Sequence, residues 1–378
     1  MRTEVLVVGG GIAGASAAYW LGLRRKVLLV EREASFCYHS SGRSAAEWAP
    51  LHFDGVLRGL IEMGRPFFET PPPLYRGAAL LERRGALLFA APGGASVQVP
   101  AGFGEISVAR TRSIVPFLRN EVLGECYYDP GTGDIDVHTL QLGFLRGVRD
   151  AGGATLTNVE FHGAERHGGL WRARIGADTI EVPLIVAAAG AWTDVVAARA
   201  GVTGLGLEPR RRTALSFDPG FDAGRTPPVE ELASGFYFKG AGRALMVCAG
   251  DATPSPPCDA QPEELDIAVA VDHFERCTTL SVRRLTSRWA GLRCFVADEQ
   301  PIAGEAVDAP GFFFIAGQGG AGIMSAPGLG ETAAALALGE ALPARAVELG
   351  ITAAALSPQR LRRPAAAAGT RDPGARPP

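Results

Sequence analysis

The stretch VLVVGGGIAGASAAYWL at residues 5–21 decides the fold class of this chain. Residues 5–8 form a short apolar run, glycines dominate residues 9–14, and an alanine-rich helical pattern follows. A second apolar run at residues 26–30 completes the order strand, glycine turn, helix, strand. Two parallel strands joined through a helix need a right-handed crossover, so the sequence predicts an open α/β sheet.

The glycine turn has the spacing GxGxxG. Gly9 permits the tight turn, Gly11 lets the backbone approach a pyrophosphate, and Gly14 allows the helix to pack closely on the strand. The helix N-terminus then offers N–H groups to a diphosphate. Glu31 ends the next strand, where a carboxylate can accept hydrogen bonds from both ribose hydroxyls of an adenosine. The pattern predicts an ADP-containing dinucleotide and disfavours NADP, because the carboxylate would repel its 2′-phosphate.

The same glycine spacing recurs at residues 317–322, after an apolar run and before a helical pattern at residues 323–338. A second dinucleotide site is one interpretation. However, no strand with a terminal acid follows this helix, because Ala-Leu-Pro at residues 341–343 interrupts the chain. We prefer a loop that points the helix N-terminus at another part of the first cofactor, where it would stabilise a ring that becomes anionic on reduction.

Composition restricts the class of protein. The chain has 37 basic and 40 acidic side chains among 378 residues, a net charge of −3, which does not favour nucleic acid or anionic lipid as a partner. A hydrophobic content of 47% predicts a soluble globular protein. The 6 cysteines show no CxxC pair or zinc-like spacing, so we expect a reduced, cytoplasmic protein without a metal site. No apolar run reaches the roughly 18 residues of a membrane span.

The remaining pattern indicates two interleaved domains. Strand-like segments at residues 79–91 and 105–109, and most of residues 206–303, belong to a strand-rich second region. Strand, glycine loop and helix return near the C-terminal end, so the first sheet collects segments from both ends of the chain. The predicted boundaries are residues 1–78, 137–205 and 295–361 for the nucleotide-binding domain, 79–136 and 206–294 for the second domain, and 364–378 for a disordered tail.

Five segments carry a resemblance to a known family: GGGIAGASAAYWL at 9–21, YHSSGRSAA at 38–46, AAAGAW at 187–192, WAGLRCFVAD at 289–298 and GQGGAGI at 317–323. Their order and spacing resemble the D-amino acid oxidase superfamily of FAD enzymes, and most closely the bacterial FAD-dependent D-arginine dehydrogenases. The resemblance implies noncovalent FAD, a Rossmann-like FAD domain of the glutathione-reductase type, and a mixed-sheet α+β substrate domain that covers the isoalloxazine ring.

The resemblance also implies which residues contact FAD. They are Gly9, Gly11, Ile12, Ala13, Gly14, Glu31, Arg32, Ser41, Gly42, Arg43, Ser44, Val159, Ala189, Gly190, Trp192, Gly319, Gly320, Gly322, Ile323 and Met324. Gly291 stands where relatives with covalent flavin carry a cysteine, so we expect no covalent bond to the cofactor.

Two arginines clamp the substrate carboxylate in the family, and Arg212 and Arg293 resemble them. Tyr237 resembles a tyrosine that hydrogen-bonds the same carboxylate, and the carbonyl of Gly320 resembles an acceptor for the substrate amine. Each arginine in isolation is also compatible with a structural ion pair, and Tyr237 with a core tyrosine.

The residues that would recognise an arginine side chain are not reproduced. Ala86 takes the position of a glutamate that faces the substrate guanidinium, with Glu82 the nearest acid, and Met324 replaces a glutamine. We therefore expect D-arginine to lose its advantage over apolar D-amino acids, because an unpaired buried cation is costly.

Two further departures lie beside the flavin loop. Glu47 replaces an active-site histidine and is either an ion-paired acid or a carboxylate that faces a substrate cation. A lid tyrosine of the family becomes His52 or Phe53.

The function expected from the resemblance is FAD-dependent oxidation of a D-amino acid to an imino acid, which hydrolyses to the 2-oxo acid and ammonia. The electron acceptor stays open. One alternative is oxidation of a secondary amine or glycine-like acid, as in sarcosine and glycine oxidases. Another is a FAD-binding subunit that only relays electrons.

Overall fold

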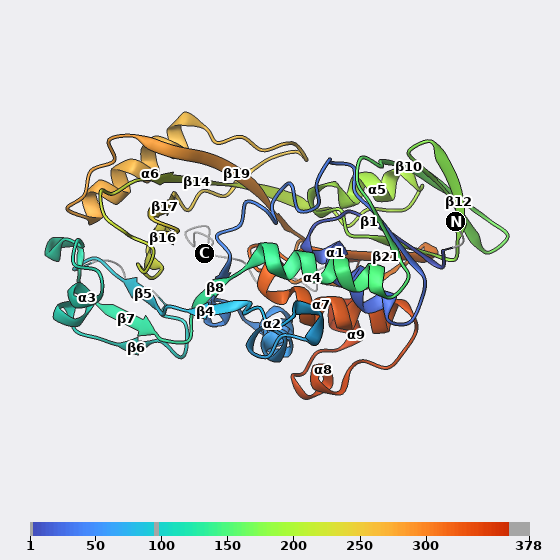
Figure 1. The fold of residues 1–378 in the computed structure, drawn as a ribbon, viewed down its shortest axis with the longest axis horizontal. Helices are drawn as coiled ribbons and strands as arrows, with labels where there is room; N and C mark the ends of the chain where they lie inside the picture. Colours follow the sequence, from blue (N-terminus) through green and yellow to red (C-terminus); the bar gives the residue numbers. More distant parts are fainter. Residues whose placement is uncertain (1–2, 94–97, 363–378) are drawn as a thin grey trace.

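The computed structural model describes residues 3–93 and 98–362, and the predicted tail at 364–378 lies outside them. Figure 1 shows two large sheets at opposite ends of the chain's long axis. Strands β5, β6, β7, β16 and β17 lie in the left half of the view, β14 and β19 run from there toward the centre, and β1, β10, β12 and β21 lie in the right half.

The six-stranded sheet has the order β20-β21-β13-β1-β2-β9. Its strands are β1 (Val5–Val8), β2 (Val27–Val30), β9 (Ala154–Leu156), β13 (Leu184–Ala187), β20 (Ile302–Ala306) and β21 (Ala309–Ala316). β1 pairs in parallel with β2 and β13, and only β20 is antiparallel to its neighbour. The predicted α/β sheet assembled from both ends of the chain is therefore confirmed.

Both faces of this sheet are covered. Val5 and Val7 of β1 pack in a core with the helices α1 (Ile12–Gly22), α2 (Gly55–Glu69), α4 (Val137–Asp150) and α7 (Gly322–Ala337). Leu6 and Val8 pack in a second core with α5 (Thr193–Arg199) and the antiparallel strands β10 (Phe161–His167), β11 (Leu170–Ile175) and β12 (Asp178–Val182). Burial on two faces explains why these strands are continuous apolar runs rather than alternating ones.

The second large sheet is mixed and nine-stranded. Its order is β18-β14-β17-β16-β15-β5-β7-β6, with β19 also pairing β14. The strands are β5 (Ala86–Phe89), β6 (Gly104–Glu105), β7 (Cys126–Asp129), β14 (Glu208–Phe217), β15 (Val229–Glu231), β16 (Tyr237–Ala241), β17 (Ala244–Cys248), β18 (Thr253–Pro254) and β19 (Leu285–Phe295). One face packs against α3 (Val108–Ile114) and α6 (Glu264–Cys277), which leaves the opposite face for a site.

A small sheet of β3 (Glu47–Trp48), β8 (Gly133–Ile135) and β4 (Leu81–Arg83) lies between the large ones. The remaining helices are α8 (Ala344–Glu348) and α9 (Ala353–Leu356), and the short 3₁₀ turns are η1 (Pro50–His52), η2 (Pro73–Tyr75), η3 (Asn120–Val122), η4 (Gly190–Trp192) and η5 (Pro358–Arg362). Across residues 3–93 and 98–362, no helix combines the length and apolarity needed to cross a membrane.

The predicted strand at residues 105–109 is wrong for most of its length. Ser107 accepts a hydrogen bond from the Arg110 N–H at 3.2 Å, and this side-chain cap begins helix α3 at Val108. The capping serine thus favours a helix here, although the alternating apolar residues around it favour a strand.

Helix α1 approaches strand β1 unusually closely at Gly14. A Cβ on this residue would lie 1.9 Å from the carbonyl oxygen of Gly9. Gly9 itself has a φ of +107°, which turns the chain from the strand into the helix. The predicted need for glycine at both positions therefore has a direct steric cause.

We expect Gly14→Ala to destabilise the fold by about 1–3 kcal/mol, the usual cost of forcing extra volume into a packed contact. Gly22→Ala is the matched control, because the nearest atom to its Cβ would be the Cβ of Ala151 at 3.8 Å, and alanine favours a helix. Thermal unfolding of both variants measures the difference. Equal Tm values for Gly14→Ala and the wild type would contradict the steric argument.

Candidate active site

The first glycine turn is fixed by the acid at the end of β2. The Gly10 N–H donates to Oε2 of Glu31 at 2.7 Å, and the Glu33 N–H donates to Oε1 at 2.9 Å. A Cβ on Gly11 would meet only the Ser41 Oγ, at 3.4 Å, so the backbone at Gly11 stays open on that side. This arrangement leaves the turn accessible to a diphosphate.

A cavity of about 140 Å³ lies beside this turn, and we call it the adenosine cavity after its predicted occupant. The predicted residues that line it are Gly9, Gly11, Glu31, Arg32, Ser41, Val159, Ala189, Gly190 and Trp192. The Arg32 guanidinium lies 4.6 Å from the centre of the Trp192 ring and holds one wall of the cavity. Residues from four distant segments thus meet where the sequence predicts the nucleotide.

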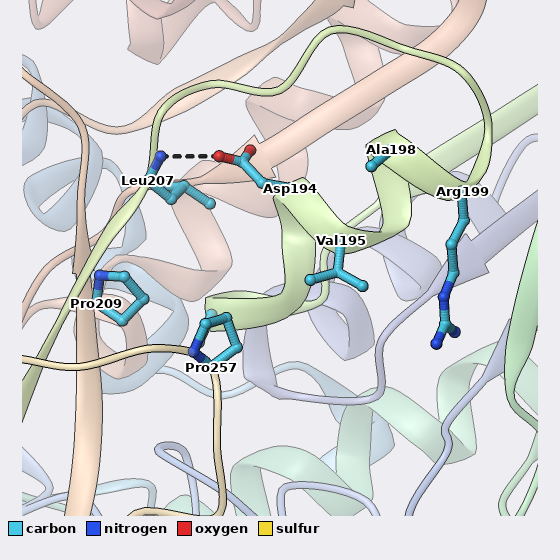
Figure 2. A pocket seen from close by; sticks show the side chains of 8 residues that line it. Asp194, Val195, Ala198, Arg199, Leu207, Pro209 and Pro257 are labelled. Carbon is cyan, nitrogen blue, oxygen red and sulfur yellow. Dashed lines mark hydrogen bonds between the residues drawn. The ribbon is translucent and has the colours of Figure 1, made fainter.

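A broader cavity of about 560 Å³ opens on the outer side of α5, next to the adenosine cavity (Figure 2). The Asp194 carboxylate accepts hydrogen bonds from the N–H groups of Leu205 and Leu207 at 2.8 and 2.9 Å. Arg199 donates to Glu160 at 2.7 Å. Because these charged groups already have partners, we assign no ligand to this cavity.

The loop at residues 40–44 connects the glycine turn to β19 of the second large sheet. The Ile12 N–H donates to Ser41 Oγ at 3.0 Å, and Ser40 Oγ donates to the Leu292 carbonyl at 2.7 Å. Arg43 donates to two further backbone carbonyls, one of them on β19. The start of α1 is therefore held against the strand that carries Arg293.

The second glycine loop is also attached to β19. The Gly319 N–H donates to the Cys294 carbonyl at 3.0 Å. Gly317 and Gly319 have φ values of +74° and +54°, and a Cβ on Gly319 would lie 2.7 Å from the Phe295 ring. Helix α7 begins directly after this loop, at Gly322. The loop thus faces the same cavity as Ile12, as the preferred interpretation predicts, rather than a second nucleotide site.

Another cavity of about 460 Å³ lies between the loops and the open face of the nine-stranded sheet, and we call it the substrate cavity after its predicted occupant. The predicted residues that line it are Ile12, Ser41, Arg43, Ser44, Glu47, His52, Arg212, Tyr237, Arg293, Gly319, Gly320, Gly322, Ile323 and Met324. Ser41 lines both this cavity and the adenosine cavity. The two cavities therefore form one elongated cradle on either side of the glycine turn.

Four predicted residues line neither cavity. Ala13 and Gly14 lie inside α1, and a Cβ on Gly42 would lie 2.3 Å from the Cys37 carbonyl oxygen, so these positions serve close packing. Ala86 is buried at the start of β5, 3% exposed. The structure does not bring Ala86 to the substrate cavity, so the expected preference for apolar side chains has no contact there to support it.

Arg212 and Arg293 project from the same sheet face. In the antiparallel register of β14 and β19, Arg212 faces Gly291 and Arg293 faces Arg210. Among the described residues, neither Arg212 nor Arg293 has a carboxylate oxygen within 4.0 Å, and Nε of Arg212 is buried without a hydrogen-bond partner. A Cβ on Gly320 would lie only 3.3 Å from Cζ of Arg293. Two guanidinium groups without a carboxylate partner therefore lie beside the Gly320 backbone, where they can bind an anion.

Tyr237 lies on β16 of the same face. Burial raises its pKa well above the ordinary value, so the phenol stays neutral and can donate a hydrogen bond. Its neighbours in register are Glu230 on β15 and Cys248 on β17.

The structure adds three cavity-lining acids that the sequence analysis missed: Glu230, Asp251 and Glu299. Asp251 accepts hydrogen bonds from the N–H and hydroxyl of Thr213 at 2.7 and 3.0 Å, so it fixes the strand beside Arg212. Glu230 lines the cavity without such partners. No motif surrounds Glu230, and only its pairing with the strand of Tyr237 identifies it.

Glu230 and His52 are neighbours. Oε2 of Glu230 lies 3.8 Å from Nδ1 of His52. Burial raises the pKa of Glu230 to about 7, although Arg212 and Arg293 oppose this shift. Burial also lowers the pKa of His52, so the imidazole is neutral at neutral pH.

Glu47 belongs to a charge network around Lys239 and also interacts electrostatically with His52 and Glu230. Lys239 is 4% exposed and donates to the Ala45 carbonyl at 2.6 Å and to Asp134 at 2.5 Å. Its Nζ lies 3.9 Å from Oε1 of Glu47, an oxygen that is buried without a hydrogen-bond partner. Burial raises the pKa of Glu47, and Lys239 opposes the shift.

This cradle defines the class of protein. The glycine turn, Glu31 and the adenosine cavity fit an ADP moiety, and the N-terminus of α7 faces the second cavity, where a redox-active ring fits. A dinucleotide-dependent oxidoreductase combines these features.

Comparison with known proteins agrees with this class. The model of the FAD dependent oxidoreductase (DAO) family matches residues 4–336, so the chain belongs to this family. FAD is accordingly its cofactor, and the residues of the cradle fit it.

The curated relatives are distant. The bovine FAD-dependent oxidoreductase domain-containing protein 1 is 24% identical over 406 residues, covering 89% of this chain and 81% of the relative. Human mitochondrial sarcosine dehydrogenase is 25% identical over 246 residues, covering 60% of this chain and 26% of the relative.

Solved structures share the fold at low identity. L-Proline dehydrogenase from P. horikoshii superposes with a TM-score of 0.78 at 21% identity, covering 96% of this chain and 98% of the other. Glycine oxidase from Geobacillus kaustophilus gives a TM-score of 0.76 at 20% identity, covering 90% and 95%.

We expect denaturation of the purified protein to release FAD intact, because Gly291 offers no thiol for a covalent bond. Glu31→Arg should lower the fraction of protein that retains FAD, since it removes a ribose acceptor and the partner of the Gly10 N–H. Absorbance of the supernatant after precipitation measures both results.

The matched control is Glu181→Arg, an exposed position on strand β12. Flavin that remains with the precipitate would contradict the noncovalent site. Equal flavin content in Glu31→Arg and the control would contradict the assignment of Glu31.

Proposed function

We propose that this protein oxidises a D-amino acid at its Cα–N bond and passes the electrons to FAD. The observation that carries the proposal is the pair of unpaired guanidinium groups, Arg212 and Arg293, in a cavity bordered by the flavin-side loops. Bidentate arginine contacts fix a planar carboxylate in position as well as in charge. The preference for the D-enantiomer rests on the resemblance of this clamp to that of D-amino acid enzymes.

The chain's own residues orient the substrate. Arg212 and Arg293 would bind the carboxylate, the Tyr237 hydroxyl would donate to it, and the Gly320 carbonyl would accept an N–H of the amine. Most of the rate enhancement would come from holding the substrate Cα at a fixed place beside the isoalloxazine ring. FAD supplies the hydride acceptor when it is bound. The loops at residues 40–44 and 317–320 close the cavity on the cofactor side.

A second candidate is oxidation of a secondary amine such as sarcosine. The 25% identity to human sarcosine dehydrogenase over 60% of this chain favours it. The clamp would serve both reactions, because both substrates carry an α-carboxylate.

A substrate panel separates these readings. FAD-loaded protein is mixed anaerobically with D-amino acids, their L-enantiomers, sarcosine and glycine, and flavin absorbance is followed. The proposal predicts reduction by D-amino acids, with rates above those for the L-enantiomers and sarcosine. Faster reduction by sarcosine would support the secondary-amine candidate, and no reduction by any amine would favour a relay subunit.

We expect Arg212→Met and Arg293→Met each to lose about 2–5 kcal/mol of transition-state stabilisation, because each removes one partner of a desolvated charge pair. The rate of anaerobic flavin reduction at limiting substrate measures the loss. Arg288→Met is the matched control on the same strand, where the side chain is 51% exposed and pairs with Glu264. Wild-type rates in both clamp variants would place the carboxylate elsewhere.

A further inference from the structure

We propose that Glu230 takes a proton from the substrate ammonium and that His52 carries this proton toward solvent. The inference rests on the proposed oxidation of an amino acid. Both side chains line the substrate cavity, and the carboxylate clamp uses neither of them.

The sheet register places Glu230 opposite the clamp. Ala214, Cys248, Tyr237 and Glu230 are successive partners on β14, β17, β16 and β15, and all four line the cavity. Neighbouring strands lie about 4.8 Å apart, so this row crosses the cavity floor from the β14 side to Glu230. Arg212 stands two residues from Ala214 on the same face. Glu230 therefore lies at the far end of this row from the strand that carries Arg212, while Asp251 and Glu299 also line the cavity.

The guanidinium groups and the Glu230 carboxylate together match the opposite charges of an amino acid zwitterion. The guanidinium groups of Arg212 and Arg293 lack a carboxylate within 4.0 Å among the described residues. Among the same residues, His52 is the one basic side chain within this distance of the Glu230 carboxylate, and its ring is neutral. Both guanidinium groups lower the pKa of Glu230, as expected of cations that line the same cavity. A carboxylate on the arginines directs the neighbouring ammonium toward Glu230.

The proton step completes the chemistry of the oxidation. One N–H bond of the ammonium breaks, its electron pair stays on nitrogen, and the proton forms an O–H bond on Glu230. The nitrogen lone pair then forms the C=N bond as the Cα hydrogen leaves with its electron pair to the flavin. The substrate loses one proton and one hydride, which gives the iminium acid.

His52 provides the exit for the proton. Its Nδ1 lies 3.8 Å from Glu230, a separation that catalytic contacts often shorten when substrate binds. Burial lowers the pKa of His52 while Glu47 and Asp129 oppose the shift, so the neutral ring can accept a proton. The His52 side chain is 23% exposed, which allows transfer to water.

The charged and titratable groups around the pair come from every neighbouring element. They are Glu47 on β3, Asp129 on β7, Arg212 on β14, Tyr237 on β16 and Arg293 on β19. Glu230 accepts a proton only as the carboxylate, so the rate should fall as pH drops through its pKa of about 7.

The test compares wild type with Glu230→Gln in anaerobic flavin reduction from about pH 6 to about pH 9, using the D-amino acid that the panel ranks first. In the wild type, the rate at limiting substrate should rise through pH 7 and level off. In Glu230→Gln it should be about 100-fold lower near pH 7, the usual contribution of a general base, and should keep rising toward the pKa of the ammonium itself. Glu230→Asp should recover part of the rate.

A more acidic substrate probes the step directly. For D-amino acids with an electron-withdrawing β-substituent, the ammonium loses its proton more readily, so the deficit of Glu230→Gln should shrink. Binding of 2-aminoisobutyrate gives a readout without turnover, because this amino acid has no Cα hydrogen to lose. Its Kd in the wild type should increase as pH falls through 7, and Glu230→Gln should lack this dependence.

Glu231→Gln is the matched control. Glu231 is the next residue on β15, points to the other sheet face, and lies 3.9 Å from His273. An unchanged pH profile in Glu230→Gln, or a loss confined to substrates with cationic side chains, would overturn the proposal while the proposed function stands. Failure of every amino acid to reduce the wild-type flavin would overturn both.

Discussion

The backbone hydrogen bond from Gly319 to the Cys294 carbonyl is the constraint on which the rest of the site depends. It attaches the loop before α7 to strand β19 of the other large sheet. The attachment point on β19 is Cys294, the residue that follows Arg293. A side chain at position 319 would collide with the Phe295 ring, so only glycine permits this contact. The dipole of α7 and the guanidinium of Arg293 therefore converge on one cavity because two segments of backbone meet.

Much of the fold follows from sequence because its signals are local. The apolar run, glycine turn and helix at residues 5–21 contain their own steric reasons, and the structure shows the expected contact between Gly14 and Gly9. The segment at residues 105–109 could not be assigned in this way. There the decisive interaction is one capping hydrogen bond, which Ser107 accepts from the Arg110 N–H at the start of a helix inside an otherwise strand-rich region.

The residues of the site also differ in whether the sequence predicts them. Ser41 and Gly320 were expected from the family resemblance, and both line the substrate cavity. Glu230 was not predictable, because it enters the cavity through pairing between β15 and β16, which no local signal specifies. Ala86 shows the converse: alignment to a family position selects it, yet its strand buries it away from the cavity.

The buried Lys239 amine can report on the contact between strand β16 and the segments that carry Ala45 and Asp134. The chain contains two lysines, and Lys26 is exposed at the start of β2. Lys239 is enclosed by the Ala45 carbonyl and Asp134, so the folded protein hides its primary amine. Acylation at this position requires the flavin-side loop to separate from the sheet. The rate at which an amine reagent modifies Lys239 thus measures how often the cavity opens at its base.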